Sequence, residues 1–300
     1  MNPPARRGLT WARREALTGW LLVLPSILLF ALFFVAPVLH SMILGFYRWD
    51  IISDAEYVGL EHYKDLFADP VFGEVVGNTA KYSVATVVLT LVLGLALAVL
   101  VNQRGRFYTV VQACIFTSYI VSWVGVSLLW VWLLDGQYGL VNYVLSPLGI
   151  EKINWLGDPD VALWALVAVT VWKTLGYDMI IYLAGLQSIP DDLYEAAALD
   201  GAGPLRRFWY VTLPQLAPTT LFLLITSVIF TFQGFDVVRI MTQGGPVHAT
   251  SIYVYWVWEQ AFRYFHVGRA SAAVTLFFFA ILIITVVQFR LYRTGREGAR

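Results

Sequence analysis

Residues 185–214 read GLQSIPDDLYEAAALDGAGPLRRFWYVTLP and form a polar island between two apolar stretches. Pro190 ends the preceding helix and fixes φ for a new one, and the acidic pair Asp191 and Asp192 suits the positive first turn of that helix. The pattern predicts a short amphipathic helix over Leu193–Leu199, after which Gly201 allows the backbone to turn. We expect this helix to lie across a membrane surface and to present a face to a soluble partner.

The composition excludes a soluble globular chain. Of the 300 residues, 59% are hydrophobic and 13% are charged, and the mean hydropathy is +0.68. The sequence has no Gly-rich phosphate-binding loop of the Gly-x-x-x-x-Gly-Lys-Ser/Thr kind, so ATP hydrolysis by this chain is not expected. The single cysteine, Cys114, excludes an intramolecular disulfide, and the four histidines lack ligand spacing, so no metal site is predicted.

Six apolar runs are long enough to cross a bilayer, which takes roughly 20 helical residues. They are Trp20–Phe46, Thr79–Val101, Val110–Leu134, Val161–Leu186, Thr219–Ile240 and Ala270–Leu291. The runs are continuous rather than alternating, so helices are expected instead of a β-barrel. The first run follows arginines and lacks a small-residue cleavage site, which predicts an uncleaved signal anchor. The predicted fold class is an all-α membrane protein with about six transmembrane helices.

The basic residues give the expected orientation, because cytoplasmic segments are enriched in Lys and Arg. With six spans, all four Arg-bearing segments fall on one side: Arg6, Arg7, Arg13 and Arg14; Arg104 and Arg106; Arg206 and Arg207; and Arg290, Arg293, Arg296 and Arg300. Both termini are therefore expected in the cytoplasm. The predicted organisation is a cytoplasmic segment 1–19, one membrane domain 20–293 and a tail 294–300, with external loops at about 48–77, 135–160 and 241–268 and a cytoplasmic segment 188–215.

One spaced pattern within the polar island resembles a known family. The pattern consists of Glu195-Ala196-Ala197, then Gly201 after three intervening residues, Val211 after nine more, and Leu213-Pro214 after one more. It resembles the EAA signature of ABC-importer permeases, with Val211 where the pattern usually has Ile. Gly244-Gly245-Pro246 after the fifth run is typical of maltose-type and glycerol-3-phosphate-type permeases. The chain is thus similar to the F-like permease of the carbohydrate-uptake class, with a type I importer fold.

The resemblance implies a set of partners and a coupling site. In that family the island is a coupling helix that docks into a groove of a cytoplasmic ATPase. The implied ATPase-coupling residues are Glu195, Ala196, Ala197, Asp200, Gly201, Leu213 and Pro214. The implied partners are a homologous second permease, two copies of the ABC ATPase, an extracytoplasmic solute-binding protein and the lipid of a prokaryotic inner membrane, with no nucleic acid. ATP and Mg would be bound by the ATPases, and this chain would hold no cofactor.

Polar residues inside the runs are candidates for a solute site, because charge at bilayer depth is costly. They are Lys81 in the second run, Lys173 and Asp178 in the fourth, and Asp236 and Arg239 in the fifth. Tyr177 shares a helical face with Lys173. Ser227, Phe230, Thr231 and Gly234 form one stripe, which composition alone would assign to helix packing. The family resemblance instead implies that a substrate site is lined by Lys173, Thr174, Tyr177, Ser227, Phe230, Thr231 and Gly234.

The expected function is transport without chemistry in this chain: import of a sugar or oligosaccharide by alternating access. Thr231 and Gly234 replace the amide side chains of the maltose case, which leaves the solute open. Glycerol-3-phosphate or a related phosphodiester is an alternative, and Lys173 could meet its phosphate. An ion-coupled secondary transporter would need paired membrane carboxylates and inverted repeats, and neither is evident. An intramembrane enzyme would need a nucleophile–base or metal grouping that the sequence lacks.

Overall fold

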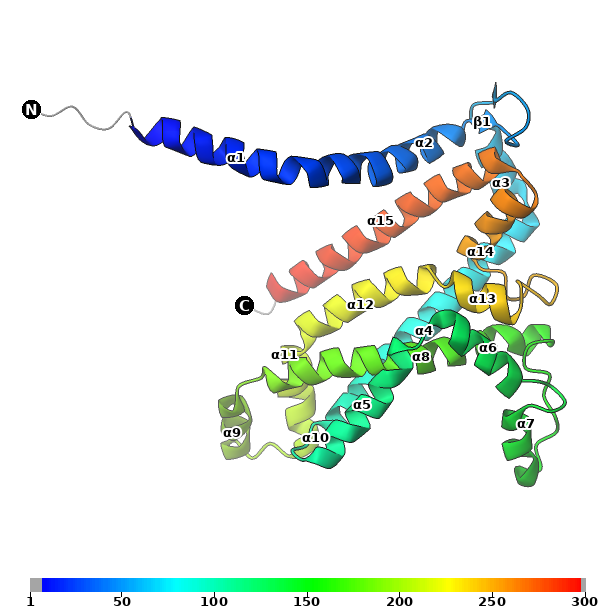
Figure 1. Cartoon of the computed structure of the whole chain (residues 1–300). Helices are drawn as coiled ribbons and strands as arrows, with labels where there is room; N and C mark the ends of the chain where they lie inside the picture. The colour runs from blue at the N-terminus through cyan, green and yellow to red at the C-terminus, as the bar shows by residue number, and fades with distance from the viewer. Residues whose placement is uncertain (1–6, 298–300) are drawn as a thin grey trace, which may run out of the picture. The chain divides into compact units, whose positions relative to one another are not determined.

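The computed structural model describes residues 7–297, with side chains for residue 11 and residues 13–290. Arg6 and Arg300, which contributed to the charge pattern, lie outside the described residues, as do the side chains of Arg7, Arg293 and Arg296. Two compact units make up the chain: Met1–Leu66 with Gln260–Phe277, and Phe67–Glu259 with Phe278–Arg300. Most of the described residues are helical (Figure 1), which confirms the predicted fold class.

The first unit begins with a long helix that carries Arg13, Arg14 and Glu15 in its early turns and is almost entirely apolar from Trp20 onward. Helix α1 (Arg7–Phe30) continues through a π-helical turn (Ala31–Val35) into α2 (Ala36–Leu44). A helix that is apolar on every side suits a lipid environment. Strand β1 (Tyr47–Arg48) follows and pairs antiparallel with β2 (Glu56–Tyr57), with Tyr47 opposite Tyr57 and Arg48 opposite Glu56. This is the only sheet within residues 7–297.

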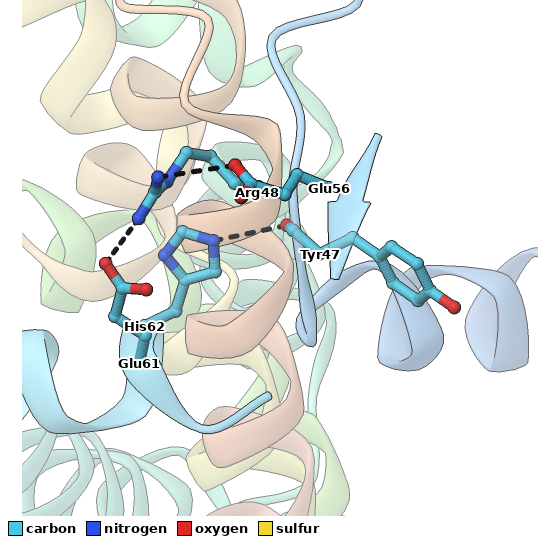
Figure 2. A network of polar contacts seen from close by, with 5 residues as sticks. All are labelled: Tyr47, Arg48, Glu56, Glu61 and His62. Atoms are coloured by element: carbon cyan, nitrogen blue, oxygen red, sulfur yellow. Dashed lines mark hydrogen bonds and ion pairs between the residues drawn. The ribbon is translucent and has the colours of Figure 1, made fainter. Parts of the chain in front are cut away.

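A polar network ties this two-stranded ribbon to its neighbours (Figure 2). The Arg48 guanidinium contacts the Glu56 carboxylate at 3.5 Å and also the carboxylate of Glu61, at the start of α3 (Glu61–Ala68). The His62 Nε2 atom lies 3.2 Å from the Tyr47 carbonyl oxygen. The Trp49 carbonyl accepts a 3.1 Å hydrogen bond from the Val267 amide, where α15 (Val267–Glu297) begins. The first and last long helices are therefore joined through this ribbon.

The second unit holds the remaining helices. They are α4 (Pro70–Val101), α5 (Arg106–Ile120), α6 (Trp123–Leu133), α7 (Leu140–Leu145), α8 (Pro159–Gln187), α9 (Asp191–Leu199), α10 (Pro204–Arg207), α11 (Leu213–Gln215), α12 (Ala217–Phe232), α13 (Phe235–Met241) and α14 (Tyr253–Trp258). Helices α4 and α8 form the largest helix pair, and α5 and α12 pack against them. Both central helices start at an Asp-Pro pair: Asp69 and Asp158 accept backbone N–H bonds of 2.9 Å, while Pro fills the first helical position.

Apolar side chains of α4 and α8 form the core of the second unit. One cluster gathers around Tyr82, Leu166 and Tyr255, and another around Ala98, Met179 and Leu223. Each of the two helices contributes to both clusters, since Tyr82 and Ala98 lie on α4 while Leu166 and Met179 lie on α8. The α4–α8 pair is therefore the frame on which the other helices of this unit are placed.

Five described helices are long and apolar enough to span a membrane, or six if one bent pair is a single span. The bent pair corrects the prediction of a continuous third span over Val110–Leu134. Val121 and Ser122 adopt extended backbone angles, with ψ of 142° and 140°, so α5 and α6 meet at an angle of 98°. The second span begins earlier than expected, at Pro70 instead of Thr79, because the Asp69-Pro70 start signal lies outside the apolar run.

The segments expected to be external loops contain more helix than predicted. Segment 135–160 contains α7, and the Asn142 side chain fastens the loop around it: its Nδ2 donates to the Ile153 carbonyl (2.9 Å), and its Oδ1 accepts from the Trp155 Nε1 (2.9 Å). Segment 241–268, expected as a loop, contains α14. Its aromatic side chains Tyr255 and Trp256 are buried, and this packing stabilises the helix.

Candidate functional site

A cavity of about 620 Å³ opens within the second unit. Its walls come from α4, from the break between α5 and α6, from α8, and from α12 with the start of α13. All seven residues expected at the solute site line it: Lys173, Thr174, Tyr177, Ser227, Phe230, Thr231 and Gly234. The two stripes identified in the sequence, on the fourth and fifth runs, thus face one cavity. Its volume is in the range of small-molecule sites.

Sequence reasoning missed a large part of the lining. The additional residues are Tyr82, Thr86, Thr90, Tyr119, Ile120, Val121, Ser122, Trp123, Thr170, Asp178, Gln233, Asp236 and Val237. The α4 members recur every four residues, a helical-face signal that the sequence does contain. The residues of the α5–α6 break carry no such signal, because they line the cavity only through the bend. Asp178 and Asp236 stood out as membrane charges but were not assigned to the site.

Three aromatic rings form a corner of the cavity. The rings of Tyr119 and Tyr177 are stacked, with centroids 5.0 Å apart and planes at 25°. The Phe230 ring meets Tyr177 edge to face, with centroids 6.4 Å apart. Phe230 remains 49% exposed, so its face is available to a bound molecule. Such surfaces suit the C–H faces of a sugar ring or another flat apolar group.

Lys173 is buried beside this corner, with only 2% of its surface exposed. Its Nζ donates a 2.5 Å hydrogen bond to the Tyr119 carbonyl oxygen and lies 5.2 Å and 5.3 Å from the ring centroids of Tyr119 and Trp123. The Tyr119 carbonyl belongs to the last turn of α5, where carbonyls lack helical partners. Lys173 therefore neutralises the end of a broken helix as well as lining the cavity.

Hydroxyl groups form much of the remaining wall. The Tyr82 and Thr170 hydroxyls are hydrogen-bonded to each other at 2.8 Å and join α4 to α8. Thr174 and Thr231 donate to carbonyls of their own helices, at 2.8 Å and 3.0 Å. Their oxygens keep lone pairs for an incoming donor. The cavity thus combines aromatic faces with hydroxyl groups.

Five of the seven expected coupling residues lie at one end of α8, in an exposed segment of residues 188–207 that we call the coupling bracket. Its helix α9 stands at an angle to α8 (Figure 1). Glu195, Ala196, Asp200 and Gly201 are exposed, and Ala197 is half-buried. Gly201 has φ +75°, a left-handed conformation that favours glycine. The predicted helix over Leu193–Leu199 is confirmed and begins two residues earlier, at Asp191.

Side-chain contacts join this bracket to the segment that leads into α12. The Tyr194 hydroxyl of α9 lies 3.0 Å from the Thr212 hydroxyl, and the Arg207 Nε donates a 2.7 Å bond to the Ala202 carbonyl. Leu213 and Pro214 follow in α11, the first half-buried and the second exposed. Leu199 and Leu205 are 90% and 73% exposed, so the bracket presents apolar side chains to its surroundings. Within the part of the chain that the structure describes, no group of three or more His, Cys, Asp or Glu residues is placed to hold a metal ion.

Comparisons with known proteins agree with this architecture. Residues 90–294 match the family described as binding-protein-dependent transport system inner membrane component. The sulfoquinovosyl glycerol transport system permease protein SmoG of Agrobacterium fabrum is 34% identical over 93% of this chain and 92% of its own length. The trehalose/maltose transport system permease protein MalF of Thermococcus litoralis is 34% identical over 95% and 96%. The sn-glycerol-3-phosphate transport system permease protein UgpA of Escherichia coli is 33% identical over 90% and 92%.

Solved structures give the same fold. A bacterial alginate ABC transporter, crystallised in complex with an alginate pentasaccharide-bound periplasmic protein, contains a chain with a TM-score of 0.84 to this one. That match has 24% sequence identity and covers 96% of this chain and 98% of the other. The fold is therefore that of a type I ABC-importer permease. With the family matched over residues 90–294 and relatives aligned over nearly the whole length, the chain belongs to the binding-protein-dependent transport system inner membrane components.

Proposed function

We propose that this chain is the membrane-spanning subunit of an ATP-driven importer that carries a neutral sugar, glycoside or oligosaccharide. Two of the relatives above are named for sugar or glycoside transport. The observation that carries the proposal is the lining of the cavity, where the aromatic corner of Tyr119, Tyr177 and Phe230 stands beside a wall of hydroxyl groups. Aromatic faces and hydroxyls match the C–H faces and hydroxyl groups of carbohydrates.

The charges of the cavity favour a neutral solute over a phosphate. Lys173 is the one cation among the lining residues, against the two carboxylates Asp178 and Asp236. The Lys173 ammonium is also occupied by the Tyr119 carbonyl. The ammonium keeps two further N–H donors, but a phosphate bound to them would share the cavity with two groups of like charge. The similarity to a glycerol-3-phosphate permease makes that solute the second candidate.

Transport would proceed by alternating access with separate partners. An extracytoplasmic binding protein would deliver solute, a second permease would complete the cavity, and two ATPase subunits would receive the exposed face of α9. The positive-inside rule supports cytoplasmic termini and a cytoplasmic α9. Glu195 would orient α9 in the ATPase groove, and the small side chains of Ala196 and Ala197 would allow close contact.

Reconstitution of the complex tests the proposal. The chain would be co-purified with the ATPase, second permease and binding protein of its complex and placed in liposomes loaded with ATP. Labelled maltose and trehalose are compared with labelled glycerol-3-phosphate. ATP-dependent uptake of a sugar supports the proposal, and uptake of glycerol-3-phosphate alone contradicts the neutral-solute assignment while leaving the importer intact.

A further inference from the structure

Two buried polar atoms in the cavity wall are without a hydrogen-bond partner among the described residues: the Asp178 Oδ2 and the Thr86 Oγ1. Asp178 lies on α8 and Thr86 on α4, and each residue is only 1% exposed. A buried polar atom without a partner costs free energy, and native structures keep few of them. Since both atoms belong to residues that line one cavity, a molecule inside it is the available source of hydrogen bonds.

The position of Asp178 is fixed by the packing of α4 against α8. Tyr82, Thr86, Thr90 and Gly94 recur every four residues along α4 and form one face of that helix. At Gly94 the helices approach so closely that an added Cβ would lie 2.9 Å from the Asp178 Cβ. The Thr90 hydroxyl of this face donates to the Val87 carbonyl at 3.2 Å, and the Asp178 Oδ2 has no hydrogen-bond partner among the described residues. The carboxylate is thus held in place at the cavity wall.

No positive group of the described cavity lining satisfies this carboxylate. Lys173 is the one basic residue among the lining residues. Lys173 is five positions from Asp178 on α8, but its ammonium bonds to the Tyr119 carbonyl. A solute hydroxyl can donate to a carboxylate oxygen, and it can also accept from or donate to the Thr86 hydroxyl.

We propose that Asp178 and Thr86 form a polar subsite that hydrogen-bonds hydroxyl groups of the transported sugar, and that Asp178 thereby determines solute specificity. This inference rests on the proposed function, because it deepens the same cavity. Thr86 adds α4 to the solute site, and Asp178 adds a carboxylate on α8. The residues expected from the sequence lie on α8, on α12 and at Gly234, just after α12. A solute would therefore be held between the aromatic corner and the α4–α8 wall.

Deoxy sugars test the subsite, because a site built to hydrogen-bond a hydroxyl discriminates against an analogue that lacks it. Uptake of maltose, trehalose and their monodeoxy derivatives is compared in the reconstituted complex at saturating binding protein. We expect wild type to take up at least one monodeoxy sugar about tenfold more slowly than its parent. Asp178→Leu should remove that preference by slowing the parent, and Asp178→Asn should restore part of it. Thr86→Val should likewise reduce the preference for a parent sugar over its monodeoxy derivative.

The matched control is Ser83→Ala. The Ser83 hydroxyl is also buried on α4 without a partner among the described residues, but Ser83 does not line the cavity. This variant should keep the full deoxy-sugar preference. If the Asp178 and Thr86 variants also keep it while wild type transports sugar, the subsite is overturned and the proposed function stands. If wild type imports only glycerol-3-phosphate, the neutral-sugar assignment fails first.

Thiol labelling tests the position of the subsite without any solute. In a Cys114→Ser background, which removes the only cysteine, Asp178→Cys and Thr86→Cys should react with a small methanethiosulfonate reagent in the nucleotide state that opens the cavity, because both positions line it although each is only 1% exposed here. The control Met179→Cys should not react, since Met179 is fully buried in the apolar core and does not line the cavity. Failure of both cavity positions to react in either nucleotide state of the folded complex would overturn the proposal.

Discussion

The buried ammonium of Lys173 donates a 2.5 Å hydrogen bond to the Tyr119 carbonyl at the point where α5 ends. In a membrane-spanning segment, an interrupted helix is tolerated where other groups satisfy the freed backbone atoms. The bend of 98° between α5 and α6 creates such atoms, and Lys173 supplies one of the donors they need. The Lys173 ammonium, whose charge suggested a phosphate ligand, is thus hydrogen-bonded to the Tyr119 carbonyl within the protein.

Lys173→Met should therefore destabilise the protein whatever the solute. The Tyr119 carbonyl would lose a charged donor, and such bonds contribute about 1.5–3 kcal/mol. We expect a lower midpoint of thermal inactivation in detergent, measured by the loss of monodisperse protein. Lys81→Met is the control, because Lys81 is an exposed lysine of α4. Equal midpoints for Lys173→Met and wild type would show that the hydrogen bond does not support the bend.

Removal of the aromatic corner should reduce transport. Phe230→Ala removes a half-exposed ring, and aromatic contacts contribute on the order of 1 kcal/mol beyond buried area. Uptake of a sugar should fall severalfold, while stimulation of ATP hydrolysis by the binding protein should largely persist, because delivery and coupling involve other surfaces. Tyr177→Ala should give the same pattern. Normal transport by both variants would identify these rings as packing surface.

Changes in the coupling bracket should abolish uptake without loss of membrane insertion. Gly201→Asp places a side chain on a residue with φ +75°, which only glycine adopts readily. Glu195→Lys reverses the charge of an exposed residue on the face expected to meet the ATPase. ATP-driven uptake is measured at equal expression of each variant. Wild-type rates with either change would contradict the coupling assignment.

A finer change in the same bracket removes a single hydrogen bond. Tyr194→Phe deletes the hydroxyl that lies 3.0 Å from the Thr212 hydroxyl and leaves the exposed face of α9 intact. We expect ATPase binding to persist while sugar uptake per ATP hydrolysed decreases. Tyr210→Phe is the control, since Tyr210 is 76% exposed. An unchanged transport-to-hydrolysis ratio in Tyr194→Phe would exclude a role for this bond.

The orientation is tested by single cysteines in the Cys114→Ser background. Cysteines at Ile52 and Ile150, which are 91% and 43% exposed, should react with a membrane-impermeant reagent added outside intact cells. Cysteines at Gly105 and Leu205 should react only after the cells are opened, because they adjoin the arginines expected in the cytoplasm. Labelling of Leu205→Cys from outside would reverse the orientation.

The sequence predicted most of the fold because membrane spans depend on composition and length alone. It also predicted α9, since Pro190 and the acidic pair after it are local signals. The bend at Val121 and Ser122 was missed because neither residue is a helix breaker and the surrounding run is uniformly apolar. Stripes on α8 and α12 predicted part of the cavity. The α4 wall and Asp178 were missed because their role depends on which helix faces which, and that depends on packing between distant segments.

The bond between Tyr194 and Thr212 also has a mechanical consequence. Helix α9 is joined at one end to α8 through Ser188 and Ile189, and its side is fastened to the segment that leads into α12. Helix α8 carries Lys173 and Tyr177, and α12 carries Ser227 and Phe230. Both cavity walls are therefore connected to α9. A displacement of α9 would therefore reach α8 through the chain and α12 through this hydrogen bond, so that one contact with α9 acts on both walls.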